Sequence, residues 1–189
     1  MKNFLPSFIK KQYLEGVRQG SFEAYTMFVD LSGFTAMTEV LMRQGNEGAE
    51  KLSRILNSIF TPPVRLVYQR GGFIPYFAGD AFTAIFPKPN DPEFTIDFLA
   101  TADEICCLVS SPDFNLDEFR IGMKIGLSFG KVEWGIVGSN RQSFYFRGPG
   151  IDQCAESQMH GSIGEIVLDA HLKRELPSSI NVTAHGSKG

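Results

Sequence analysis

Two short apolar runs, separated by four small or acidic residues, most restrict how this chain can fold. The runs are Phe73–Phe77 and Phe82–Phe86, and Ala78-Gly79-Asp80-Ala81 lies between them. Short runs rich in Phe and Ile on either side of a Gly-Asp pair are typical of two strands joined by a tight turn. The pattern predicts a β-hairpin with Asp80 at its tip.

Further elements are expected on both sides of this hairpin. An apolar strand is predicted at Ala24–Val29, ending in Asp30, and a helix from Gly33 to about Arg43. A second helix is predicted from Gly48 to Tyr68, which Pro62 and Pro63 should kink or divide. One further expected element precedes these, a short amphipathic lead-in at Asn3–Leu14. The elements expected after the hairpin are a helix at Phe94–Val109, strands at Arg120–Ser128 and Val132–Val137 joined through Gly130, a strand at Phe144–Phe146, a helix at Ile151–Met159, a strand at Glu165–Leu168, a helical turn at Ala170–Leu176 and a strand at Ile180–Thr183.

The order of the expected core elements is β-α-ββ-α-β, which is the order of the split βαβ arrangement. We therefore expect an α+β fold with a ferredoxin-like βαββαβ core, in which helices pack on one face of a largely antiparallel sheet. A chain of 189 residues fits one domain with a full core. The expected division is a lead-in segment at residues 1–20 and a single domain at residues 21–185.

Charge and composition restrict the partners. The 18 Lys and Arg against 21 Asp and Glu give a formal charge of −3, which offers no footprint for nucleic acid and no polybasic membrane anchor. We find no apolar stretch of about 18 residues and no signal-peptide core, so no membrane segment is expected. The three cysteines suggest no disulfide framework, which favours a cytoplasmic protein.

Two acidic residues, Asp30 and Asp80, stand at a strand end and at a hairpin tip. In a βαββ unit these positions can be neighbours, and paired carboxylates are the hard oxygen ligands that Mg²⁺ and Mn²⁺ prefer. The segment Leu31–Thr35 leads into a helix, where backbone amides and the helix dipole favour a phosphate. Taken singly, Asp30 or Ser32 could cap that helix and Asp80 could be an ordinary turn residue. Taken together, they favour a metal and phosphate site.

Three sequence motifs resemble those of class III adenylyl and guanylyl cyclases. They are Phe28-Val29-Asp30-Leu31-Ser32-Gly33-Phe34-Thr35, Phe77-Ala78-Gly79-Asp80-Ala81, and a glycine-punctuated hairpin at Gly126–Val132 with Gly135–Gly138. The resemblance covers about Glu23 to Leu176. Within this family, the chain is most similar to the first domain of the soluble, bicarbonate-responsive tandem adenylyl cyclases. In those proteins a segment similar to Phe4–Ile9 often precedes the domain.

The resemblance implies a mechanism. Two Mg²⁺ or Mn²⁺ ions would be held by Asp30, Asp80 and the Leu31 carbonyl, and would promote attack of the ribose 3′-hydroxyl on the α-phosphate of ATP or GTP. Nucleotide contacts are expected at Leu31, Ser32, Gly33, Phe34, Thr35 and Gly79. The product would be a cyclic nucleotide, with cAMP from ATP favoured, together with pyrophosphate.

The same resemblance indicates what the chain lacks. In the family, a partner domain supplies a lysine, a base-reading residue, an asparagine and an arginine, and the corresponding positions here are Tyr76, Pro149, Asp152 and Glu156. No Arg or Lys occurs between Gly148 and Leu172, so a small shift of the alignment restores no arginine. We expect a homodimer with little activity and no bicarbonate response through this domain. Catalysis would require a second cyclase domain in cis or in trans. The alternative is a catalytically silent domain that serves in regulation or dimerisation.

Overall fold

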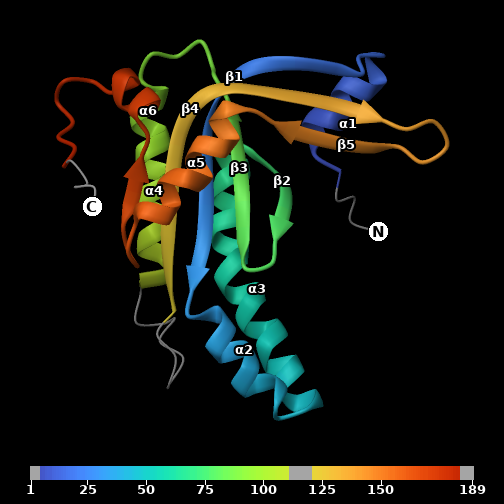
Figure 1. Ribbon diagram of the computed structural model, residues 1–189, viewed down its shortest axis with the longest axis vertical. Coiled ribbons are helices and arrows are strands. Elements are labelled where there is room, and N and C mark those ends of the chain that lie inside the picture. Colours follow the sequence, from blue (N-terminus) through green and yellow to red (C-terminus); the bar gives the residue numbers. More distant parts are fainter. Residues whose placement is uncertain (1–4, 111–120, 184–189) are drawn as a thin grey trace.

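The computed structural model describes residues 5–110 and 121–183. The elements are α1 Ser7–Leu14, β1 Gln19–Ser32, α2 Phe34–Met42, α3 Asn46–Gln69, β2 Phe73–Ala78, β3 Ala81–Pro87, α4 Phe94–Ser110, β4 Gly122–Val137, β5 Ser143–Arg147, α5 Pro149–His160, β6 Ile166–Leu168 and α6 Ala170–Glu175 (Figure 1). Part of the expected lead-in, residues 1–4, and Arg120 lie outside the described residues.

One six-stranded sheet organises the molecule. Its order is β2-β3-β1-β4-β5, and β6 pairs with β4. The pairing of β6 with β4 is parallel, and the other pairings are antiparallel. The hairpin predicted around Asp80 is present as β2 and β3. The α+β fold class and the antiparallel-rich βαββαβ core are thereby confirmed.

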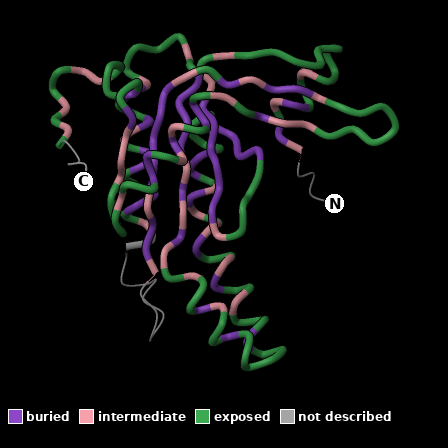
Figure 2. The backbone as a smooth tube through the Cα atoms, in the orientation of Figure 1, coloured by how far each residue is buried: buried purple, intermediate pink, exposed green. Residues whose placement is uncertain are grey.

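The two faces of the sheet carry different layers. Alternate β1 side chains such as Tyr25 enter the main core, where its ring lies 5.3 Å from the rings of both Phe94 and Phe98 in α4. The intervening residue Thr26 points the other way, and its hydroxyl donates to the Gly150 carbonyl of α5 at 2.7 Å. The helices α3 and α4 therefore cover one face and α5 crosses the other (Figure 1). Buried residues follow the central strands between these layers (Figure 2).

The expected break at Gly130 is wrong, because β4 runs unbroken from Gly122 to Val137. The glycine serves a close approach instead of a turn. A Cβ at Gly130 would lie 3.2 Å from the Gly150 nitrogen, so its absence lets the start of α5 rest on the strand. The turn of this late hairpin lies between β4 and β5, where Gly138 has a φ of 95°.

Two other expectations differ from the structure. The helix α3 is not divided, since it continues through Pro62 and Pro63 while burying Ile55, Ile59 and Leu66 in the core. That packing outweighs the local cost of proline in a helix, about 3 kcal/mol. The segment Ile180–Thr183 is not a strand; the Ile180 amide donates to the Pro177 carbonyl in a turn.

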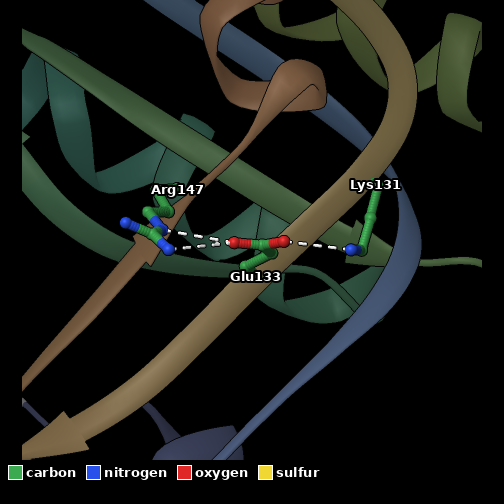
Figure 3. Close-up of polar contacts among 3 residues, drawn as sticks. All are labelled: Lys131, Glu133 and Arg147. Atoms are coloured by element: carbon green, nitrogen blue, oxygen red, sulfur yellow. Dashed lines mark hydrogen bonds and ion pairs between the residues drawn. The ribbon is translucent and has the colours of Figure 1, made fainter.

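The N-terminal end of β1 and the C-terminal end of β4, together with β5, form an arm beyond the main core. One side is covered by α1, whose Phe8 ring lies 5.3 Å from that of Trp134 and 5.4 Å from that of Phe73. The other side carries a charge cluster in which Glu133 accepts hydrogen bonds from Lys131 at 2.9 Å and from Arg147 at 3.2 Å (Figure 3). The hydrogen bond from Lys131 is the main cause of the lowered pKa of Glu133. Exposed ion pairs of this kind add little to stability.

In the part of the chain that the structure describes, no helix combines the length and the apolar character needed to cross a membrane.

Candidate functional site

The two expected metal ligands lie side by side at one end of the sheet. Asp30 is near the end of β1 and is paired in register with Ala81 of β3. The Leu31 amide donates to the Asp80 carbonyl at 3.2 Å, which holds the β2–β3 turn against β1. Gly79, with a φ of 64°, gives that turn its left-handed step. The Asp30 pKa is raised by burial first and by the nearby charge of Asp80 second.

A lysine that the sequence did not single out lies beside this pair. Lys124 of β4 is the register partner of Asp30, and its charge acts to lower the Asp30 pKa. It is distant in sequence, so only the pairing of β1 with β4 brings it to the site. Among the residues that the structure describes, these two carboxylates and Lys124 together carry net negative charge, which a divalent ion can compensate.

A glutamine completes the surroundings of Asp30 and was also missed. Gln158 of α5 donates from Nε2 to Asp30 Oδ2 at 2.8 Å, across 128 positions of sequence. Its side chain is buried, although Gln is usually exposed. We call Asp30, Asp80, Lys124 and Gln158 the carboxylate site. The available sequence signal was a polar residue on the side of the expected helix that should face the core. That signal did not indicate Asp30 as its partner.

The start of α2 adjoins the carboxylate site. Gly33 has a φ of 88° at the N-cap, and no side chain caps the helix there. The simple capping role considered for Asp30 or Ser32 is therefore absent. Gly33 and Thr35 are exposed and Phe34 is partly buried, so the first amides of α2 lie where an anion can reach them. Their contact with a nucleotide remains a prediction.

The donor set fits a magnesium-like ion. Among residues 5–110 and 121–183, no three or more His, Cys, Asp or Glu side chains gather as a metal cage. Mg²⁺ usually binds one or two carboxylates and fills its other positions with water and substrate phosphate oxygens. The two adjacent carboxylates, with Lys124 as a neighbouring cation, match that requirement. The role of the Leu31 carbonyl as a further ligand is a prediction.

The positions expected to serve a partner's site lie on the same side of the sheet. Tyr76 of β2 pairs with Thr83, and the nearby charge of Asp152 on α5 contributes to raising the Tyr76 pKa, after burial. Pro149 opens α5 and is exposed, and Glu156 is exposed and accepts a hydrogen bond from Gln153 at 2.9 Å. We call Tyr76, Pro149, Asp152 and Glu156 the α5 surface. It carries two carboxylates and none of the cations expected of an active partner.

The sheet order, the hairpin carboxylate and the helix start together define an α+β domain of the nucleotidyl cyclase type. Comparison with known proteins agrees. A family model described as "Adenylate and Guanylate cyclase catalytic domain" matches residues 18–188. The chain belongs to this family.

Individual relatives extend the comparison. Adenylate cyclase type 10 of Homo sapiens is 32% identical over 154 residues, which are 78% of this chain but 9% of that protein. The guanylyl cyclase Cya2 has the same fold, with a TM-score of 0.72 and 20% identity over 89% of this chain and 85% of that chain. A class III adenylyl cyclase-like ATP-binding protein from Pseudomonas aeruginosa also matches, with a TM-score of 0.70 and 16% identity, over 85% of this chain and 36% of that one.

Proposed function

We propose that the chain is the metal-binding half of a nucleotidyl cyclase that converts a nucleoside triphosphate into a cyclic nucleotide and pyrophosphate. The observation that carries the proposal is the pairing of β1 with the β2–β3 turn, which sets Asp30 beside Asp80 next to an uncapped helix start. ATP is the favoured substrate, because the similar human protein is named an adenylate cyclase.

In this proposal the chain's own residues bind and orient the metal ions and the triphosphate. Asp30 and Asp80, with the Leu31 carbonyl, would hold two Mg²⁺ or Mn²⁺ ions. When bound, these ions act as Lewis acids that favour ionisation of the 3′-hydroxyl and offset charge on the triphosphate. The amides of Gly33, Phe34 and Thr35 bind phosphate oxygens, and the neighbouring Ser32 and Gly79 complete this backbone surface.

The α5 surface supports a need for a partner. Tyr76 has no fixed positive charge, Pro149 offers no side-chain hydrogen bond to a base, and Glu156 is negative where a developing phosphate charge needs a cation. Removal of one preorganised donor costs about 10²–10³ in rate. A second cyclase domain that carries lysine, asparagine and arginine, in cis or in trans, is therefore part of the proposal.

The test compares the purified chain alone with the chain mixed with such a domain, each with Mn²⁺-ATP. Cyclic nucleotide and pyrophosphate are measured by chromatography. We expect product in the mixture and little from the chain alone. Rapid turnover by the chain alone would refute the partner requirement. If Mn²⁺-ATP neither binds nor reacts in either sample, the proposed function fails.

A silent regulatory domain is the second candidate, favoured by the two carboxylates of the α5 surface. It predicts that the chain dimerises with a cyclase domain without adding product-forming sites. Loss of the mixture's activity on Asp80→Asn substitution in this chain would count against it.

A further inference from the structure

We propose that Gln158 is a positioning residue for the metal ligand Asp30, so that α5 sets the geometry of the carboxylate site. The proposal rests on the proposed function, since it concerns how that same site binds a divalent ion. It adds a residue that lies 128 positions from Asp30 and belongs to neither aspartate motif.

The direction of the hydrogen bond follows from chemistry. An ionised carboxylate only accepts, so the Gln158 amide nitrogen must face Asp30 Oδ2, at 2.8 Å. A carboxylate has about four lone-pair sites, and this contact uses one of them. Oδ1 and the second lone pair of Oδ2 stay available for metal. Gln158 therefore restrains the Asp30 side chain without competing for the whole ligand.

The position of Gln158 is fixed by the seating of α5 on β4. An added Cβ at Gly126 would lie 1.9 Å from the Cys154 carbonyl oxygen and 2.5 Å from the Gln158 nitrogen. Only glycine lets the helix backbone come this close to the strand. At the helix start, Thr26 donates to the Gly150 carbonyl at 2.7 Å, so α5 is anchored to β1 at both ends.

Burial restricts the movement of the Gln158 side chain and so holds its hydrogen bond to Asp30 in place. Gln158 is 6% exposed and α5 lies directly over the sheet, so its amide has little freedom to leave Asp30. Hydrogen bonds to metal-binding carboxylates orient them, and removing such a bond typically costs about 10–100-fold in metal affinity. Asp80 sits in a turn, and within residues 5–110 and 121–183 we find no side-chain hydrogen bond that restrains it in the same way.

The experiment uses the full chain, freed of metal with a chelator and titrated with Mn²⁺ alone. Free Mn²⁺ is followed by electron paramagnetic resonance. Gln158→Met keeps the length and apolar bulk of the side chain but removes the donor. The matched control is Gln153→Met on the same helix, where the amide bonds to Glu156 and not to the carboxylate site. We expect Gln158→Met to weaken Mn²⁺ binding by about 10-fold or more and the control to bind as the wild type does.

Measuring Mn²⁺ affinity and melting temperature together distinguishes a positioning role of Gln158 from a purely structural one. A residue that only stabilises the fold would lower the melting temperature without changing the Mn²⁺ affinity of the folded fraction. Wild-type affinity in Gln158→Met would overturn the proposal and leave the proposed function intact. An absence of Mn²⁺ binding in the wild type would instead defeat the proposed function itself.

A second variant guards against misfolding of the first. Gln158→Asn keeps the amide but shortens the side chain by about 1.5 Å, one carbon–carbon bond. It should also lose the contact with Asp30 and show the same weakened binding. Tight binding by a folded Gln158→Asn would contradict the proposal.

Discussion

The carboxylate site and the α5 surface share one face of the sheet, yet they differ in what they can do. The carboxylate site has two acidic groups set together by β pairing, one neighbouring cation and a buried amide. The α5 surface has a tyrosine, a proline and two more carboxylates, and within the described residues its side chains bring no positive charge. The first region suits a divalent cation, whereas the second would repel a polyphosphate.

The difference indicates that the two functions proposed for a cyclase domain, metal binding and substrate binding, are separable. This holds although α5 contributes to both regions. The outer side of α5 carries Asp152 and Glu156, while its inner side carries Gln158 against Asp30. A change of charge on the outer side leaves the backbone seat on Gly126 and Gly130 untouched. In the proposed function, the chain can therefore keep a metal site and lose a substrate surface without refolding.

The largest expected effect comes from removing a carboxylate. In the mixture with a complementary domain, Asp30→Asn or Asp80→Asn should lower the turnover number by about 10³-fold or more, because metal ions contribute several kcal/mol of charge stabilisation. Product formation at saturating Mn²⁺-ATP measures this. Asp97→Asn, at an exposed position of α4, is the control and should change nothing. Retained activity in both site variants would break the comparison, since neither carboxylate would then be needed.

The next effect should come from rebuilding the α5 surface. The triple change Tyr76→Lys, Asp152→Asn and Glu156→Arg restores the expected cation and amide positions. It should raise the activity of the chain alone by about 10²-fold, the lower value for one preorganised donor. Glu50→Arg on the exposed side of α3 makes a charge reversal elsewhere and should give no gain. If the folded triple variant stays inactive, the α5 surface is not what limits the chain.

The sequence predicted the parts of the site that are local. The strand before Asp30, the turn around Asp80 and the helix after Gly33 follow from patterns of a few residues, and β pairing then joins them. Lys124 and Gln158 could not be predicted in this way, because their contacts with Asp30 depend on the β1–β4 register and on the seating of α5. Gly130 was misread for the same reason: a glycine for a turn and a glycine for close packing look alike in sequence.

A smaller effect, on stability, should follow from unseating α5. Gly126→Ala places a methyl group within 1.9 Å of the Cys154 carbonyl oxygen, a backbone atom that cannot rotate away. Overpacking of this kind typically costs about 1–3 kcal/mol, and we expect the upper end. Gly130→Ala, with its nearest backbone atom at 3.2 Å, should cost less. Urea unfolding measures both. Equal stabilities for the two variants would show that α5 can shift, and would weaken the view that one fixed helix serves both regions.

The smallest effect concerns the stability of the metal-free protein. The pKa of Asp30 is raised above the ordinary value of 3.8 by burial and by Asp80, so its charged form destabilises the fold at neutral pH. This penalty is relieved as the pH falls through the folded-state pKa, because the folded protein then takes up a proton more readily than the unfolded chain. In chelator, Asp30→Asn should therefore be more stable than the wild type at pH 7, by less than about 1 kcal/mol for a partly exposed group. The amide oxygen introduced by this substitution can still accept from Gln158, so that contact does not confuse the result.

The stability advantage of Asp30→Asn should shrink on acidification, and saturating Mn²⁺ should reverse it, because only the wild type gains a bound ion. A variant that is less stable than the wild type at pH 7 without metal would mean that the two carboxylates are not held in mutual repulsion, and the contrast with the α5 surface would lose its electrostatic basis.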